Sequence, residues 1–478
     1  MPHRLVLSGN GAPRQCGSAL LSTLRPHSTT NFGTGMARSG GSGFGIQDLS
    51  RIARGRGSYV YDESGKSYLD GSGGPAVFCL GHAHPEVNAA INRQLESIAY
   101  AYRYLFTSSA LESLNEIVLR ASGNCFKDVL YSADGSEAVE SALKVALQYF
   151  AARGLMKKRR FIARRRSWHG NTLGALSVSG FAARRRAFEG SLLDVEFVSA
   201  ANEYRLPDGC TRETLVGHLA AELEQAILKL DPDTVAAFIF EPIVGAAGGV
   251  VPAPAGYAEA IRAVCAKYDV LLIADEVMCG AGRSGTWRAL EHDGVEPDLM
   301  TVAKGLGGGY IPIGATLVNA KISAPIMEEH GAYMTGHTFS GHTTACAAAV
   351  AVQQIIERDG LIERVRNVGA AFQDAVRGAL SNVDEVGDVR GRGFFIGIEL
   401  VRDRNTRAPF APERGLSFDI GQRAFADGLI CYPCSGNVDG ARGDTVILAP
   451  PYNASDAELE EITVKLARAV SNALGAKV

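Results

Sequence analysis

Two polar residues that follow apolar runs could carry covalent chemistry. Asp275 follows the run Val270 to Ala274, and Lys304 comes two residues after the run Leu299 to Val302. Short apolar runs alternating with amphipathic stretches predict a buried parallel sheet wrapped by helices. Residues that follow such strands meet in a crevice at the carboxyl edge of the sheet. Desolvation there lowers the pKa of a lysine, whose amine then acts as a Schiff-base nucleophile.

The spacing of these two residues favours one shared site. Their separation, 304 − 275 = 29 residues, fits one helical crossover between neighbouring parallel strands. A lysine that forms a Schiff base and an acid that faces a pyridine nitrogen are the protein partners of pyridoxal phosphate. A structural ion pair between Asp275 and Lys304 is the alternative.

Two further strand ends could hold other parts of such a cofactor. Gly135 and Ser136 follow the run Val129 to Tyr131 and open a helix, whose N–H groups and dipole favour a phosphate. Helix capping alone explains this pattern equally well. Trp168 and His169 follow another apolar run, where an aromatic ring could stack on a planar heterocycle or simply pack in the core.

The stretch LLIADEVMCGAGRSG, residues 271 to 285, and the following PDLMTVAKGLGGGYIPIG resemble the cofactor signature of class III aminotransferases. These are pyridoxal-phosphate enzymes of fold type I, and the resemblance runs from about Tyr59 to the C-terminus. It implies that Lys304 holds the cofactor as a Schiff base and that Asp275 pairs with the pyridine nitrogen. It also implies that Val277 packs on the ring and that Gly135 and Ser136 bind the phosphate.

Other positions depart from the family pattern or extend it. Trp168 stands where the family usually has tyrosine, so stacking is retained and a phenol hydrogen bond is lost. Glu241 is expected to brace residues near the hydroxyl edge of the ring, with a helix or turn cap as the alternative. Thr338 resembles the residue that reaches the phosphate from a neighbouring subunit, which implies a homodimer with a shared site, or a tetramer of such dimers.

The resemblance also bears on the substrates. Arg390 matches an arginine that grips a substrate carboxylate in many members, for which a forked guanidinium is suited, and Arg392 is a nearby alternative. Members that use 2-oxoglutarate often carry a glutamate that masks this arginine, where this chain has Ala246. We therefore expect an amine or ω-amino acid donor and a 2-oxo acid acceptor, pyruvate rather than 2-oxoglutarate, in a ping-pong mechanism.

Two other enzyme classes compete with this hypothesis. Pyridoxal-phosphate decarboxylases and aminomutases share the fold and would use the same Lys304 and Asp275. Gly280, Gly282 and Gly285 spell a GxGxxG pattern, the fingerprint of an NAD-dependent oxidoreductase. Because no clear helical pattern follows Gly285, a turn is the favoured interpretation.

The predicted fold class is α/β: a large domain with a mostly parallel sheet wrapped by helices, plus a smaller α+β domain from both chain ends. We expect an extension at 1–45, an N-terminal segment at 46–110 that packs with the small domain, a large domain at 111–344 and a small domain at 345–478. The extension carries arginines and no acid before Asp48, a composition typical of a mitochondrial transit peptide. A cytoplasmic protein with a disordered extension, or one that starts at Met36, is the alternative.

Composition excludes several other classes. The net charge is −3 and 46% of the residues are hydrophobic. Because acidic residues balance the basic ones, the basic run Arg184 to Arg186 and two other basic runs are predicted to lie on a solvated face and not to bind nucleic acid. The chain has no run of about 18 apolar residues and therefore predicts no membrane span. Nine scattered cysteines indicate a reducing compartment. The lone pair Cys431 and Cys434 is interpreted as structural, and no metal is expected.

Overall fold

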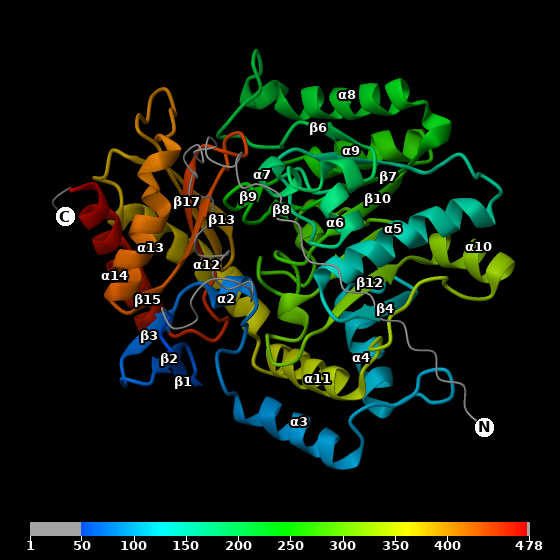
Figure 1. The fold of residues 1–478 in the computed structure, drawn as a ribbon, viewed down its shortest axis with the longest axis horizontal. Helices are drawn as coiled ribbons and strands as arrows, with labels where there is room; N and C mark the ends of the chain where they lie inside the picture. Colours follow the sequence, from blue (N-terminus) through cyan, green and yellow to red (C-terminus); the bar gives the residue numbers. More distant parts are fainter. Residues whose placement is uncertain (1–48, 476–478) are drawn as a thin grey trace, which may run out of the picture.

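The apolar runs form the centre of the molecule. The computed structural model describes residues 49–475, so the predicted extension at 1–45 lies outside it. Seven of its strands pair in the order β4-β12-β11-β10-β7-β5-β6 (Figure 1). They are β4 (Asp128–Ser132), β12 (Gly314–Val318), β11 (Leu299–Val302), β10 (Leu271–Asp275), β7 (Val235–Phe240), β5 (Arg160–Arg164) and β6 (Val195–Val198). Only β12 runs antiparallel to its neighbours, which confirms the predicted mostly parallel sheet.

Helices cover both faces of this sheet because its strands are apolar on both sides. In β7, Phe238 and Phe240 pack toward one face, and Ala237 and Ile239 pack toward the other. The first face is covered by α4 (Ser109–Ala121), α8 (Arg212–Leu230) and α9 (Tyr257–Lys267). The second is covered by α5 (Gly135–Ala152), α6 (Leu173–Ser177) and α10 (Ala320–His330).

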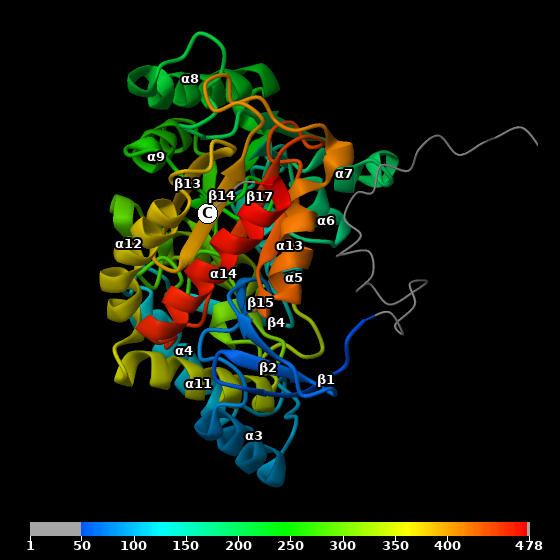
Figure 2. The ribbon, with the colours of Figure 1, turned by 90° about the vertical axis from the view of Figure 1, so that its left-hand side faces the viewer.

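A second, smaller lobe follows the large sheet in the chain. Its antiparallel sheet has the order β13-β14-β17-β16, and three helices pack against it (Figure 2). The strands are β13 (Val386–Arg392), β14 (Phe395–Leu400), β17 (Asp444–Leu448) and β16 (Tyr432–Ser435). The helices are α12 (Leu361–Ala379), α13 (Leu416–Ala426) and α14 (Asp456–Leu474). The expected α+β character of the C-terminal part is therefore confirmed.

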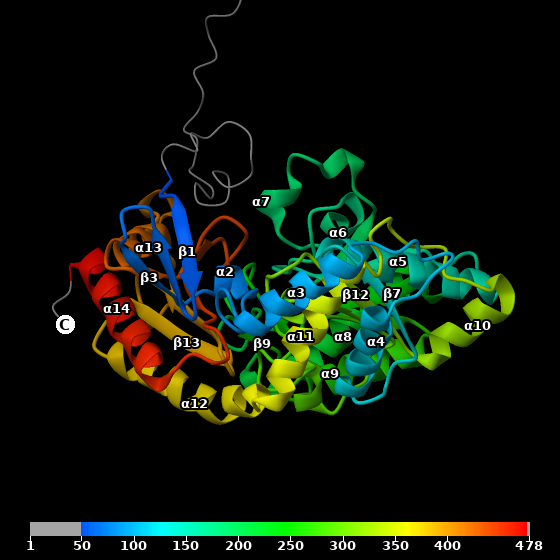
Figure 3. The ribbon, with the colours of Figure 1, turned by 90° about the horizontal axis from the view of Figure 1, so that it is seen from below.

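An N-terminal segment and a segment of the small lobe meet in a third sheet. It contains β1 (Ile52–Arg56), β2 (Tyr59–Asp62), β3 (Ser67–Asp70) and β15 (Leu429–Ile430). Leu429 pairs in parallel with Leu69, and Figure 3 shows these N-terminal strands beside α13 and α14. The shorter elements are α2 (Gly73–Ala76), α7 (Ala182–Arg185), β8 (Ile243–Val244), β9 (Val251–Pro252), η2 (Glu189–Ser191), η3 (Pro232–Thr234) and η6 (Pro412–Arg414).

One helix joins the two lobes. α11 (Thr343–Arg358) packs on α3 (Pro85–Ser97) and on α4. Its Cys346 is buried in the core of the large lobe, and its Ile356 is buried in the core of the small lobe. The predicted boundary near residue 345 therefore falls inside a continuous helix, and the proposed domain limits stay predictions.

The crossover from β10 to β11 differs from the expected helix. Its residues form turns and one short 3-10 helix, η4 (Ala289–Asp293). A Cβ at Gly282 would lie 3.0 Å from a ring carbon of Tyr452, and one at Gly285 would lie 2.9 Å from Cα of Arg366. These glycines thus allow the crossover to pack closely on the small lobe. They open no helix, so the dinucleotide-binding hypothesis is wrong and the turn interpretation is confirmed.

Among the described residues, no helix combines the length and apolar character needed to cross a bilayer. No cluster of three or more metal-ligating side chains occurs within residues 49–475. Cys431 and Cys434 are both buried free thiols, and Cys434 lies in β16 rather than at the start of a helix.

Candidate active site

The register between β10 and β11 brings the two predicted chemical groups together. Asp275 pairs with Thr301 in the parallel ladder, and Lys304 follows Thr301 by three residues in η5 (Lys304–Leu306). Both side chains line one cavity of about 430 Å³, which we call the inner cavity. Its wall also includes Gly135, Ser136, Trp168, His169, Glu241, Val277 and Met278. All but two of the predicted site residues therefore line a single space.

Three donors hold the Asp275 carboxylate in place. Oδ1 accepts hydrogen bonds from Thr301 Oγ1 at 3.0 Å and from the backbone N–H of Val277 at 3.1 Å. Oδ2 lies 2.6 Å from His169 Nδ1, and both side chains are buried. These contacts fix the orientation of the carboxylate at the wall of the inner cavity. The sequence analysis missed Thr301, although a threonine inside an otherwise apolar strand was a visible signal.

His169 and Glu241 line the inner cavity beside this acid. Glu241 is buried, and its carboxylate accepts hydrogen bonds from the backbone N–H groups of Trp168 at 3.0 Å and Gly245 at 2.9 Å. Burial raises the pKa of Glu241, against the opposing influence of His169. His169 Nε2 is buried and has no hydrogen-bond partner within the described part of the chain. Glu241 therefore fastens two loops to one wall of the inner cavity.

Lys304 is a buried amine in a strained backbone position. Burial lowers its pKa to about 8, while the charges of Asp275 and Glu241 act in the opposite direction. Its φ of +45° lies in the left-handed region, which non-glycine residues seldom occupy and which is frequent at functional sites.

The start of α5 provides a cradle for an anion. The first turn of a helix leaves N–H groups without partners inside the helix, and its dipole attracts negative charge. A Cβ at Gly135 would lie 2.9 Å from Cγ1 of Val277, and one at Gly170 would lie 2.8 Å from Cα of Ser136. Glycine thus keeps the cradle open beside Asp275 and Lys304. An anion cradle, a buried acid and a buried amine around one cavity fit the phosphate, ring nitrogen and aldehyde of pyridoxal phosphate.

A second cavity of about 620 Å³, which we call the outer chamber, adjoins the inner one at Val77, Trp168, Met278 and Lys304. Side chains from both lobes line it. They include Phe181, Arg184, Ala246, Phe418 and Tyr432. Of these five residues, the sequence analysis connected only Ala246 with the site, because the others come from distant segments: Phe181 and Tyr432 are 432 − 181 = 251 residues apart.

Arg390 lies outside both cavities, which disagrees with its expected role. Its guanidinium forms an ion pair with buried Glu399 at 2.6 Å and donates to the carbonyl oxygens of Gly248 and Val250 at 2.9 Å each. These contacts fasten the loop that carries Ala246 to the small lobe. With its donors engaged in this way, Arg390 is placed to support the wall of the outer chamber rather than to grip a substrate. Arg392 lines neither cavity either.

Thr338 also lies outside the two cavities of its own chain. It is exposed in the turn before α11, where the neighbouring Phe339 is 58% exposed. Tyr100 donates a hydrogen bond to the carbonyl oxygen of Thr338. An exposed position is compatible with a contact to another subunit, so this role stays a prediction.

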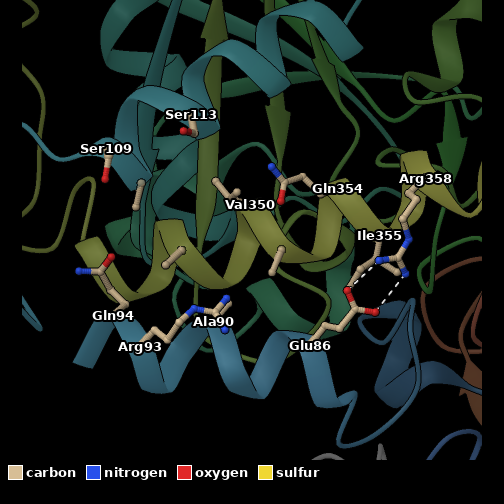
Figure 4. A pocket seen from close by; sticks show the side chains of 13 residues that line it. Glu86, Ala90, Arg93, Gln94, Ser109, Ser113, Val350, Gln354, Ile355 and Arg358 are labelled. Carbon is tan, nitrogen blue, oxygen red and sulfur yellow. Dashed lines mark hydrogen bonds and ion pairs between the residues drawn. The ribbon is translucent and has the colours of Figure 1, made fainter. Parts of the chain in front are cut away.

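A third space, of about 510 Å³, is a groove between α3, α4 and α11 (Figure 4). Its charged side chains include Arg358 and Glu86, which pair through hydrogen bonds of 2.7 and 3.1 Å. The groove lies on the helices rather than at strand ends. It contains none of the predicted site residues.

The fold and the inner cavity together define a pyridoxal-phosphate-dependent enzyme of fold type I, and its similarity to known proteins identifies it as a transaminase. The model of the family described as aminotransferase class-III matches residues 46–470, and the chain belongs to this family. An aminotransferase of Gibberella zeae is 41% identical over 87% of this chain and 83% of its own length. Gamma aminobutyrate transaminase 3, chloroplastic, of Solanum lycopersicum is 36% identical over 88% of this chain and 80% of its own. The omega transaminase of Pseudomonas jessenii, solved in complex with PMP, superposes with a TM-score of 0.84 at 33% identity, over 90% and 94% of the two chains.

Cofactor uptake should depend on pH through Lys304. Only a neutral amine attacks an aldehyde, and the neutral fraction of Lys304 grows as the pH rises through its pKa of about 8. The rate at which cofactor-free protein binds pyridoxal phosphate should therefore increase with pH, with a midpoint near 8. Stopped-flow absorbance measures this rate, with Lys304→Ala as the control. A midpoint near 10.5, the ordinary lysine value, would contradict the burial argument.

Removing the Arg390 guanidinium should destabilise the fold. Arg390→Met leaves buried Glu399 with one cation fewer, and breaking a buried ion pair costs about 3 kcal/mol or more. Urea unfolding of the holoenzyme measures this loss. The matched control is Arg392→Met, which removes an arginine two residues along the same strand and should cost less than about 1 kcal/mol. Equal unfolding midpoints for the two variants would contradict a stabilising role of the ion pair between Arg390 and Glu399.

Proposed function

We propose that this protein transfers an amino group from an amine or ω-amino acid to a 2-oxo acid, preferably pyruvate, by a ping-pong mechanism. The observation that carries this proposal is the placement of Lys304 and Asp275 at neighbouring strand ends in one buried cavity. Bound pyridoxal phosphate would supply an electron sink for the carbon that loses a proton. Lys304 would hold the cofactor, and Gly135 and Ser136 would bind its phosphate.

The residues of the inner cavity would have separate roles in the reaction. Lys304, once displaced by the donor amine, would move the proton that leaves the donor carbon. Its pKa of about 8 suits a group that must both accept and release a proton near neutral pH. Asp275, held by Thr301 and His169, would keep a proton on the ring nitrogen. Trp168 and Val277 would enclose the ring and exclude water.

The preference for pyruvate is supported by the outer chamber. Ala246 lines it, so no carboxylate stands at the position where 2-oxoglutarate users of the family often carry glutamate. Donor and acceptor would occupy the same chamber one after the other. Such alternation predicts ping-pong kinetics.

A homodimer would complete the site. Thr338 and Phe339 are exposed, and so are Tyr102, Tyr104 and Phe106, which gives this side of the protein several large apolar side chains in contact with solvent. Exposed apolar groups of this kind often mark a protein interface. Through it, Thr338 would reach the phosphate in the neighbouring subunit.

The first test is the absorbance of the purified protein. With pyridoxal phosphate bound to Lys304, an absorbance band at about 410 nm is expected. Lys304→Ala should lack it, an amine donor should bleach it, and pyruvate should restore it faster than 2-oxoglutarate does. Release of carbon dioxide without any need for an oxo acid would instead indicate a decarboxylase. A protein that stays colourless with added cofactor would rule out the proposed function.

Subunit complementation tests the role of Thr338. Thr338→Asp would place a negative charge beside the phosphate and should inactivate the site in the neighbouring subunit. A mixed dimer of Thr338→Asp and Lys304→Ala subunits contains one intact site, so equal co-expression should give about one quarter of wild-type activity. Activity that never exceeds the level of the separate variants would show that Thr338 does not act across subunits.

A further inference from the structure

The amide of one glutamine is buried beside the turn that carries Lys304. Gln353 belongs to α11, the helix that joins the two lobes, and only 3% of its surface is exposed. Its Nε2 donates hydrogen bonds to the carbonyl oxygens of Gly305 and Leu306, at 3.0 Å each. Gly305 and Leu306 complete η5 directly after Lys304. The Gln353 amide therefore binds the backbone that follows the reactive lysine.

A tryptophan from the β10 to β11 crossover fixes the orientation of this amide. Trp287 Nε1 donates a hydrogen bond to Gln353 Oε1 at 3.1 Å, and both side chains are buried. An indole N–H can only donate and a carbonyl oxygen can only accept, so the three partners determine which end of the amide is the oxygen. In the interior, a polar group that loses its partner costs free energy. The amide thus connects α11, the crossover and η5.

The backbone of Lys304 needs a restraint of this kind. A non-glycine residue in the left-handed region, here with a φ of +45°, is strained and persists only where surrounding contacts hold it. Cys79 Sγ also lies near the carbonyl oxygen of Gly305, at 3.7 Å, but a thiol is a weak donor. The two N–H donors of Gln353 are the stronger restraint that reaches η5 from another element.

The next residue along α11 carries the same amide in a different environment. Gln354 is exposed and lines the groove between α3, α4 and α11 (Figure 4). Water satisfies an exposed amide, whereas a buried amide must lose its water and is stable only with partners. Gln353 stands between the buried side chains of Val352 and Ile356 on an otherwise apolar side of the helix. Its burial is therefore explained by the groups that it binds.

We propose that Gln353 is a positioning residue, which holds the backbone after Lys304 so that the Lys304 amine meets the cofactor. Gln353 lines neither the inner cavity nor the outer chamber, so it acts through Gly305 and Leu306 and not on a substrate. The inference rests on the proposed function, in which Lys304 holds the cofactor and moves a proton. It adds a residue of α11 to the groups on which that function depends.

Cofactor uptake tests this restraint without any substrate. Gln353→Met keeps the length of the side chain and removes its N–H donors. The full-length protein, freed of cofactor, is mixed with pyridoxal phosphate, and stopped-flow absorbance reports the reaction of Lys304. The rate should fall by about tenfold or more, because two hydrogen bonds are lost and each contributes a factor of roughly two to ten.

The pH profile of uptake gives a second readout. When η5 moves away from position 353, water reaches the Lys304 amine, and this hydration weakens the effect of burial on its pKa. The midpoint of uptake should therefore rise from about 8 toward 10.5, the ordinary lysine value. The charges of Asp275, Glu241 and Arg283 also act on Lys304, and the substitution leaves them unchanged.

Two controls separate positioning from stability. Trp287→Phe removes the donor to Gln353 Oε1 and leaves Nε2 beside both carbonyl oxygens. It should lower the urea midpoint of unfolding and change the uptake rate less than about twofold. Gln354→Met removes the exposed amide and should change neither quantity. The inference is overturned if Gln353→Met takes up cofactor at the wild-type rate, or if Trp287→Phe slows uptake equally at the same loss of stability.

A second substitution keeps the test decisive if Gln353→Met does not fold. Gln353→Glu retains the volume and the acceptor for Trp287. An ionised carboxylate repels the carbonyl oxygens of Gly305 and Leu306, and a protonated one makes a single hydrogen bond in place of two. Uptake should be slower than in wild type by at least about twofold in either state. Unchanged uptake in folded Gln353→Glu contradicts the inference.

Turnover of the holoenzyme separates this inference from the proposed function. In Gln353→Met, kcat should fall about tenfold, while KM for the donor changes less than about threefold because the outer chamber is untouched. A wild type that stays colourless with added cofactor overturns the proposed function. A wild type that binds cofactor and transfers amino groups, with Gln353→Met equal to it in uptake and in kcat, overturns only the role of Gln353.

Discussion

The site depends on the parallel pairing of β10 with β11. This pairing places Asp275 beside Thr301 and brings Lys304 to the same edge of the sheet. A shift by one residue would turn Asp275 to the opposite face, because side chains alternate along a strand. Asp298 secures the register at the other end: its N–H donates to Leu272, and its carboxylate accepts from the N–H of Leu272 and from Arg262. One buried acid thus fixes the position of another acid and of a lysine.

The inner cavity and the outer chamber differ in the sign of their charged side chains. Near the sheet, Asp275 and Glu241 are buried beside Lys304 and raise its pKa against the larger effect of burial. Farther out, Arg184 is the second charged group of the outer chamber wall, besides Lys304. Buried groups interact strongly because little water screens them. The inner acids therefore suit a cationic ring nitrogen.

Close contact between the lobes gives the chamber its shape. Arg390 reaches from β13 to the loop of Gly248 and Val250, and the glycines of the β10 to β11 crossover pack against α12 and Tyr452. The wall at Ala246 is thus supported from behind by the small lobe.

The sequence by itself determined the central strands, the start of α5, and the pairing of Lys304 with Asp275 in one crevice. These features depend on short-range patterns: apolar runs, the residues that follow them, and one connection between neighbouring strands. It did not determine that the crossover after Asp275 lacks a helix, that Thr301 holds this acid, or that Arg390 is buried in an ion pair. It also gave no sign that one arginine of an exposed-looking basic run faces the chamber. Only the tertiary structure decided these points, because each depends on contacts between lobes or neighbouring strands, and local residue patterns do not encode which distant charges meet.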